Sequence, residues 1–333
     1  MLSISPLLNH SSRPSSSNTN LRDEFGKIST RCSRPPSASA SGPKARTLAC
    51  MFTPASGILS TRGAVSSIMA VALSCQGLWK IYEMGDEKVQ AIRGIDLEII
   101  AGEMVAIMGP SGCGKTTLLN ITAGFIRPTS GSITLNNKEI DGPGVERGMV
   151  FQQGALFEWL TVAENVNFGL RMKKEDPVET QKKVDEWLEI VGLKGFGNTP
   201  TYQLSGGMQQ RVALARCLIN NPDLILMDEP LGALDALTRE KMQSLVLKIW
   251  KETGKTIILI THSVEEALLL GERLYVMAPR PGRIHKEYNL PFASMGLKED
   301  LREIKKNKEF SQKREEILEM IWNMEEEIMG KDN

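Results

Sequence analysis

The sequence predicts an α/β fold with a mainly parallel sheet, and three observations favour it. Four short apolar runs have the composition of strands buried in a sheet: residues 104–108, 224–227, 256–261 and 274–277. A glycine-rich loop joins the first of these runs to a helix. Segments with apolar residues at helical intervals lie between the first two of these runs, which is the order expected when helices connect parallel strands.

Residues 1–68 differ from the rest of the chain. They are rich in Ser, Pro and Arg and lack a periodic apolar pattern, so they cannot bury a core. With few acidic residues, they resemble a chloroplast or mitochondrial transit peptide. Two other interpretations stay open: a start of translation at Met51 or Met69, and a disordered natural tail. The predicted divisions are thus a leader (1–68), a folded domain (69–292) and a charged amphipathic tail (293–333).

Charge and cysteine content argue against several classes of protein. Residues 1–70 carry a net charge of +6 and the remainder −6, and an acidic remainder speaks against a nucleic-acid-binding face. No apolar run approaches the ~18 residues that span a bilayer, so we expect a soluble or peripheral protein. The five cysteines lack paired spacing, which fits neither a zinc site nor a disulfide scaffold and suits a reducing compartment.

The folded part begins with two predicted strands, Val71–Ser74 and Ile92–Ile100, the second followed by a turn at 101–103. Tyr82 lies just before a loop expected at residues 83–88. An aromatic side chain there could stack on an adenine ring, although packing on its neighbours in the strand is the ordinary interpretation.

A phosphate-binding loop follows the apolar run 104–108. It matches the pattern G-x-x-x-x-G-K-[ST] in full and lies between a strand and a helix, as that pattern requires. Glycines allow backbone N–H groups to converge on phosphate oxygens, Lys115 supplies charge to the β- and γ-phosphates, and Thr116 offers a hydroxyl to Mg²⁺. Cys113 is interpreted as a small residue tolerated beside glycine. The loop comprises Gly109, Pro110, Ser111, Gly112, Cys113, Gly114, Lys115, Thr116 and Thr117.

Between the phosphate loop and residue 203, the pattern predicts two strands and one long helix. The strands are 132–135 and 149–151, and Gln152 leaves the second where an amide could reach a metal or a water. Residues 161 to about 191 have apolar side chains at helical intervals.

A second helix start follows a loop. Ser205 is an N-cap candidate, and Gly206 and Gly207 open a helix that continues through Leu218. Exposed N–H groups at a helix start favour anions, so this is a second potential phosphate contact.

Carboxylates and a histidine follow two of the apolar runs. Asp228 and Glu229 end the run 224–227, and strand alternation would send their side chains opposite ways. One could then hold Mg²⁺ and the other accept a proton from an attacking water. His262 ends the run 256–261 at the same expected edge, which favours contact with a γ-phosphate. The tail has apolar residues at helical spacing and is expected to pack on its own domain.

Taken together, these residues resemble the ATP-binding subunits of ABC transporters over about residues 71–290. The ordered set comprises Tyr82, the loop 109–117, Gln152, the signature 204–209, Asp228 with Glu229, the segment 232–235 and His262. Met208 departs from the Gln or Glu usual in the signature. The resemblance implies a P-loop NTPase core with an N-terminal antiparallel β subdomain and a helical subdomain that carries the signature.

The resemblance also implies what the site residues do. ATP and Mg²⁺ are the expected cofactors, and each ATP lies between the phosphate loop of one subunit and the signature of the other in a head-to-tail dimer. Glu229 polarises the attacking water, His262 holds the γ-phosphate, and Gln152 links the metal site to the membrane subunit. The implied metal ligands are Thr116, Gln152 and Asp228, and the implied contacts across the dimer interface are Ser205, Gly206, Gly207, Gln209 and Asp235.

Finer features point to a group within the family. Segments 142–148, 235–239 and 279–283 with Trp159 resemble the taurine, sulfonate and nitrate importers, and Gly-Pro-Gly-x-Glu-Arg-Gly is nearest to the taurine branch. The expected partners are a second ATP-binding subunit, two copies of a transmembrane permease and a periplasmic or extracellular substrate-binding protein, with no nucleic acid. The expected location is the cytoplasmic face of the cell membrane, or an organellar inner membrane if residues 1–68 are a transit peptide.

Two other functions are compatible with parts of the pattern. A soluble ABC protein could act on ribosomes or DNA, but such proteins usually carry two cassettes or a long coiled-coil insertion. A scaffold could bind nucleotide without cleaving it, but Glu229 and His262 are both present. An importer ATPase is therefore the leading hypothesis.

Overall fold

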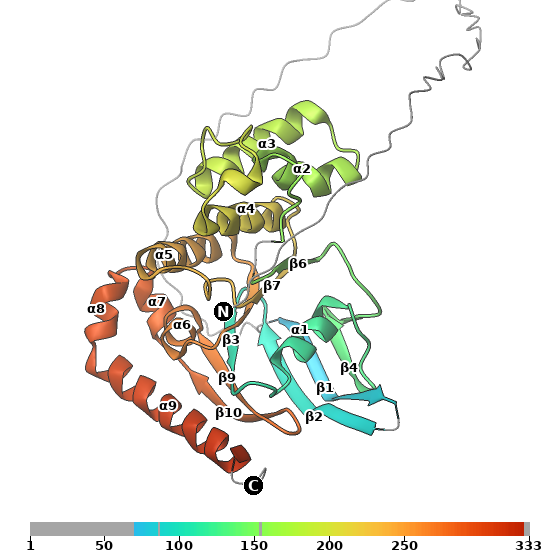
Figure 1. The fold of residues 1–333 in the computed structure, drawn as a ribbon, viewed down its shortest axis with the longest axis vertical. Helices are drawn as coiled ribbons and strands as arrows, with labels where there is room; N and C mark the ends of the chain where they lie inside the picture. Colours follow the sequence, from blue (N-terminus) through green and yellow to red (C-terminus); the bar gives the residue numbers. More distant parts are fainter. Residues whose placement is uncertain (1–69, 86, 153–154, 330–333) are drawn as a thin grey trace, which may run out of the picture. The chain divides into compact units, whose positions relative to one another are not determined.

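The computed structural model describes residues 70–85, 87–152 and 155–329. The predicted leader, residues 1–68, lies outside the described residues. Figure 1 shows the arrangement of the helices and strands.

A four-stranded antiparallel sheet is built from the first part of the described chain. Its order is β2-β1-β4-β5, with bounds Val71–Met84 (β1), Glu87–Ile100 (β2), Ser130–Leu135 (β4) and Lys138–Glu139 (β5). The loop expected at 83–88 was too long, because β1 continues to Met84, β2 begins at Glu87, and Glu83 pairs with Lys88. Charged side chains there face solvent, so the apolar pattern that marks a strand is missing.

A six-stranded sheet forms the centre of the fold. Its order is β10-β9-β3-β8-β7-β6, with bounds Met104–Met108 (β3), Arg147–Val150 (β6), Leu224–Asp228 (β7), Thr256–Ile260 (β8), Arg273–Ala278 (β9) and Arg283–Asn289 (β10). Strands β6, β7, β8, β3 and β9 run parallel, and β10 is an antiparallel edge strand. The predicted mainly parallel sheet is confirmed.

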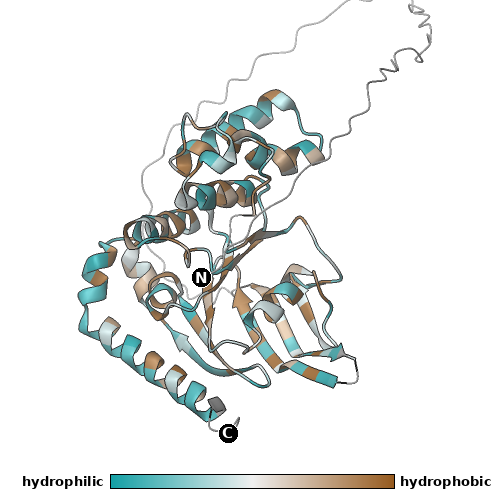
Figure 2. Ribbon diagram, viewed as in Figure 1, coloured by the Kyte–Doolittle hydropathy of each residue, from teal (hydrophilic) through white to brown (hydrophobic). Residues whose placement is uncertain are grey.

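Buried side chains of the central strands divide between two hydrophobic cores. In β3, Val105 and Ile107 face the core shared with α1 (Lys115–Ala123) and the antiparallel sheet, whereas Ala106 and its flanking methionines face the other core. Strand alternation explains the division, and burial on both faces explains the continuous apolar runs in the sequence. The strands at the centre of the larger sheet are predominantly brown in Figure 2, whereas its edge strand β10 is largely teal and the helices are mixed in colour.

Helices after β6 form the second core. They are α2 (Val162–Met172), α3 (Pro177–Ile190), α4 (Gly206–Leu218), α5 (Ala236–Thr253) and α6 (Val264–Leu270), with a short 3₁₀ turn at Thr201–Gln203. The single helix predicted for 161–191 was wrong. Lys174 has φ 57°, Asp176 caps a new helix, and Pro177 lies in its first turn, where proline has no hydrogen bond to lose.

The C-terminal segment is helical and packs on the same core. It comprises α7 (Phe292–Gly296), α8 (Leu301–Lys306) and α9 (Lys308–Met329). The rings of Phe292 and Phe310 lie 5.1 Å apart, edge to face, and Ile317 is fully buried. The expected packing of the tail on its own domain is thus observed. No helix in the described part of the chain is long and apolar enough to cross a membrane.

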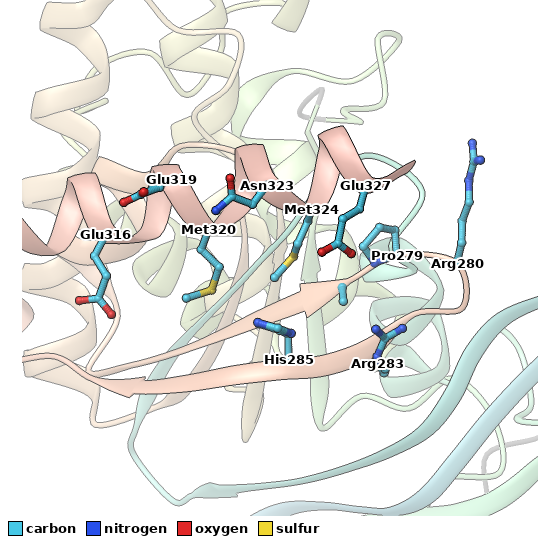
Figure 3. A pocket seen from close by; sticks show the side chains of 11 residues that line it. Pro279, Arg280, Arg283, His285, Glu316, Glu319, Met320, Asn323, Met324 and Glu327 are labelled. Carbon is cyan, nitrogen blue, oxygen red and sulfur yellow. The ribbon is translucent and has the colours of Figure 1, made fainter. Parts of the chain in front are cut away.

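A groove of about 490 Å³ lies between α9 and β10 (Figure 3). In that view Arg283 and His285 extend from β10, and Met320, Met324 and Glu327 from α9. None of the residues predicted to bind nucleotide or metal lines this groove, so it is separate from the candidate site.

Candidate functional site

The phosphate loop connects β3 to α1, and two of its glycines are required by close neighbours. Gly114 has φ 88°, and a Cβ there would lie 2.7 Å from the carbonyl oxygen of Ala91. Gly109 has φ 155°, and its Cβ would overlap the carbonyl of Met277. Gly112 has open space around it, so its requirement is the positive φ of 76° rather than room for the chain.

Lys115 is 5% exposed, and its ammonium group lies inside the loop. It donates to the carbonyl oxygens of Gly109 at 2.8 Å and Pro110 at 3.0 Å. Among the described residues, no carboxylate forms an ion pair with Lys115. A buried cation whose oxygen partners are all neutral carbonyls favours an anion, so the residues of this loop fit a bound phosphate chain.

The other loop residues divide between support and exposure. Cys113 is buried, burial raises the pKa of its thiol, and its Sγ lies 3.6 Å from Lys115 Nζ, which agrees with its interpretation as a small packing residue. Pro110 is also buried. Ser111 and Thr116 are exposed and Thr117 is half-buried. The hydroxyl of Thr116 is therefore accessible at the first turn of α1.

Asp228 ends β7 and lies at the carboxyl edge of the parallel sheet. Burial and the neighbouring charge of Glu229 raise the pKa of its carboxyl group, and His262 and Lys115 act in the opposite direction. Asp228 is therefore electrostatically coupled to the phosphate loop, although the two are far apart in sequence.

Glu229 lies outside the strand, so strand alternation does not explain its direction. Its φ is 45°, a conformation rare for a residue with a side chain, and its N–H donates to the carbonyl oxygen of Ile260 at 2.9 Å. Its carboxylate accepts from Gln152 Nε2 at 3.0 Å and pairs with His262 Nε2. Strain of this kind clusters at functional sites.

Three predicted residues from separate segments thus meet at one carboxylate. Gln152 follows β6, Glu229 follows β7 and His262 follows β8. His262 has a side chain that is 51% exposed, whereas that of Glu229 is 21% exposed. The imidazole of His262 is therefore accessible to a ligand at this edge of the sheet.

Sequence reasoning missed Gln210, whose carboxamide Nε2 donates to the carbonyl oxygen of Phe151 at 3.1 Å. Gln210 is 3% exposed, and the hydrogen bond fixes the backbone directly before Gln152. A buried glutamine in an otherwise apolar helix face was the available signal, because buried amides need partners.

The second predicted anion site is the start of α4. Ser205 caps this helix, accepting from the N–H of Met208 at 3.4 Å, and Gly206 is exposed with open space around it. Gly207 is buried, and a Cβ there would overlap Thr238 of α5. Gln209 Nε2 donates to the carbonyl oxygen of Thr201 at 3.1 Å. Gly207 thus serves helix packing, and Gly206 leaves the helix start open.

Asp235 caps α5 with hydrogen bonds from the N–H groups of Leu237 and Thr238. The side-chain hydrogen bond of Thr238, together with these backbone bonds, lowers the pKa of the Asp235 carboxyl group. Among the described residues, no hydrogen bond or ion pair joins residues 204–209 or Asp235 to the phosphate loop. The two anion sites are therefore not connected within one chain.

Tyr82 lies in β1 and is half-buried. It pairs with Val89 in the hairpin. Val89 lies two residues before Ala91, and the carbonyl oxygen of Ala91 lies next to Gly114 of the phosphate loop. The ammonium of Lys80 lies 5.1 Å from the centroid of its ring. The hairpin therefore brings Tyr82 to the border of the phosphate loop.

Comparison with known proteins identifies the family. The family model for "ABC transporter" matches residues 92–232. The taurine import ATP-binding protein TauB of Pelagibacter ubique is 84% identical over 246 residues, covering 74% of this chain and 93% of that protein. The chain belongs to the ABC transporter family. Its predicted fold class and its prediction as an ABC-type ATPase are confirmed by this membership.

Other relatives agree with this assignment. TauB of Roseobacter denitrificans is 68% identical over 259 residues, which cover 78% of this chain and 97% of that protein. Among solved structures, the dimeric ATP-binding cassette MJ0796 bound to ADP and Pi has a TM-score of 0.59 and 38% identity, covering 66% of this chain and 98% of that one. CbiO1 of Clostridium perfringens has a TM-score of 0.61 at 32% identity, covering 72% and 96%.

Proposed function

We propose that this chain is the ATP-hydrolysing subunit of an importer for taurine or a closely related sulfonate. The names of the taurine import relatives and the 84% identity to one of them support the cargo class. The observation that carries ATP hydrolysis is the carboxylate of Glu229, held between Gln152 and His262 beside a loop with a buried lysine. A protein that acts on ribosomes or DNA is not favoured by these relatives.

Each part of the site has a proposed task in hydrolysis. Lys115 and the loop N–H groups bind the β- and γ-phosphates, and Tyr82 stacks on the adenine. Glu229 orients and deprotonates the attacking water, which requires an acceptor within hydrogen-bond reach. His262 donates to the γ-phosphate and, through its pairing with Glu229, keeps the carboxylate in place.

The site also suits a magnesium ion, which would neutralise charge on the phosphates when bound. We propose Thr116, Gln152 and Asp228 as the residues that hold it, directly or through water. Hydroxyl, amide and carboxylate oxygens are the ligands Mg²⁺ prefers, and the coupling of Asp228 to the loop charge supports its proximity.

The assembly follows from the separation of the two anion sites. We propose a head-to-tail dimer in which Ser205, Gly206, Gly207, Gln209 and Asp235 of one subunit complete the site of the other. Two permease subunits and an external substrate-binding protein would complete the importer, with this chain on the cytoplasmic face of the membrane or, if residues 1–68 are a transit peptide, on an organellar inner membrane.

Substitution of Glu229 tests this function. We expect Glu229→Gln to lower phosphate release by about 100-fold or more, because the amide cannot accept the proton, while ATP binding persists. Glu265→Gln, on the neighbouring helix, is the control, since Glu265 pairs with Arg314 at the protein surface. Growth on taurine of a strain without its own ATP-binding subunit, restored by the unaltered chain and not by Glu229→Gln, tests the cargo. Unchanged turnover in Glu229→Gln would exclude Glu229 as the base.

A further inference from the structure

A buried carboxyl group lies behind His262 and takes no direct part in the proposed site. Glu266 belongs to the first turn of α6 and is 2% exposed, as is Thr261 at the end of β8. The hydroxyl of Thr261 donates to Glu266 Oε2 at 2.9 Å. The other oxygen, Oε1, is buried and accepts no hydrogen bond from the residues that the structure describes.

Three hydrogen bonds close a ring on both sides of His262. Besides the bond from Thr261 to Glu266, the N–H of Ser263 donates to Thr261 Oγ1 at 3.0 Å, and the N–H of Glu266 donates to Ser263 Oγ at 3.3 Å. The residues immediately before and after His262 are therefore both fixed, while the imidazole itself is exposed. A turn of this kind restricts the directions that an exposed side chain can take.

The ring is attached to the rest of the site by the backbone. The N–H of Thr261 donates to the carbonyl oxygen of Ile107 at 3.3 Å, one residue before the end of the strand that leads into the phosphate loop. Ile260, the preceding residue, accepts from the N–H of Glu229 at 2.9 Å. A shift of the backbone at Thr261 would therefore also displace the hydrogen-bond partners of Glu229 and of the strand that leads into the loop, as well as His262.

Charged neighbours of Glu266 come from two other segments. Burial raises its pKa to about 7, the charge of Arg239 on α5 lowers it, and that of Glu229 raises it. On the outer side of α6, Glu265 pairs with Arg314 and Lys305. Arg239 also donates to the carbonyl oxygens of Leu231 at 3.3 Å and Leu234 at 2.8 Å, in the segment before Asp235. The charge that acts on Glu266 from α5 thus belongs to an arginine that holds the segment before Asp235.

We propose that Glu266 is a positioning residue for His262: its buried carboxyl group holds the hydroxyl of Thr261, and through it the turn that aims the imidazole at Glu229 and the γ-phosphate. This inference rests on the proposed function, since it assigns Glu266 a task only if His262 takes part in hydrolysis. Glu266 is buried, so its proposed action is through Thr261 and the turn, and not by contact with the reacting groups.

The test compares variants that keep or remove the hydrogen bond. Thr261→Ser and Glu266→Gln keep a donor and an acceptor, whereas Thr261→Val and Glu266→Ala remove them. We expect the second pair to lower kcat for ATP about tenfold or more with KM within twofold, because displaced groups lose rate more than binding. The first pair should stay within threefold, and Glu265→Gln should match the unaltered full chain. Melting temperature and ATP binding verify that each variant is folded.

Two further measurements separate positioning from a purely structural contribution. If Glu266 acts through His262, adding Glu266→Ala to His262→Ala should lower kcat no further, because the effects are not additive. In the kcat–pH profile, Glu266→Gln should remove a step near pH 7 that Glu265→Gln retains.

The outcomes distinguish the two proposals. If His262→Ala leaves turnover unchanged, the proposed site fails and this inference fails with it. If His262→Ala lowers turnover but Glu266→Ala does not, or if their effects simply add, only the inference is overturned. Equal losses in all four variants, with ATP binding lost in parallel, would also overturn it in favour of general destabilisation.

Discussion

At the scale of single residues, the buried carboxyl group of Glu266 links the stability of the fold to pH. Its pKa is about 7 in the folded chain, against an ordinary value of 4.5. A raised carboxyl pKa means that the folded state keeps its proton to a higher pH than the unfolded state. The resulting contribution to the free energy of unfolding is therefore complete below about pH 4.5 and is lost as the pH rises through 7. At 1.36 kcal/mol per pKa unit, the contribution is about 3 kcal/mol.

Glu266→Gln removes this dependence, since the amide does not titrate. We expect its melting temperature, relative to the unaltered chain, to rise by several degrees between pH 5 and pH 8, as measured by calorimetry at both values. Glu265→Gln should show a constant difference. A constant difference for Glu266→Gln as well would mean that the group titrates near its ordinary pKa.

Some properties of single residues were predictable from the sequence and others were not. The pattern of apolar runs placed Asp228, Glu229 and His262 at one edge of the sheet, and the structure has them there. It could not predict that Glu229 leaves the strand with φ 45° or that Gln210 holds the carbonyl of Phe151. Both depend on contacts between segments far apart in the chain, which periodicity does not record.

At the scale of elements, strands buried on both faces were predicted to within one or two residues, since their apolar runs are continuous. Strands at the edges of the sheets were not predicted with this accuracy. Strand β10 carries the exposed residues Arg283, His285 and Lys286 and has no such run, and it was missed. The break between α2 and α3 was missed because helical spacing continues across it, although Asp176 and Pro177 are a known start signal.

The start of α4 provides an element-scale test with its own control. We expect Gly207→Ala to destabilise the fold by about 1–3 kcal/mol, because the new Cβ overlaps Thr238 and forces α4 and α5 apart. Gly206→Ala, one residue earlier with nothing within 4 Å, should cost nothing. Urea unfolding midpoints measure both. Thr238→Ser, which removes the overlapping methyl group, should restore part of the loss. Equal midpoints for the two alanine variants would contradict the packing assigned to Gly207.

At the scale of the whole molecule, the phosphate loop and the start of α4 are two halves that one chain does not join. If a partner chain supplies the missing half, two inactive variants should complement each other. Lys115→Ala removes the loop cation and leaves α4 intact. Gly206→Glu leaves the loop intact and places a negative charge at the open helix start, where its side chain meets no neighbour in its own chain.

We expect each variant alone to release little phosphate. An equal mixture of the two should recover about a quarter of the turnover of the unaltered chain, because random pairing into two-fold dimers leaves about a quarter of the ATP sites intact. Phosphate release at a fixed total concentration measures this recovery. Lys115→Ala mixed with Glu229→Gln is the control. Both of these changes lie on the loop side of the site, so every pairing of these two variants leaves both ATP sites of the dimer defective. Recovery should fall on dilution, as pairing does. A mixture that stays inactive at concentrations where the unaltered chain hydrolyses ATP would mean that the start of α4 does not complete a partner's site.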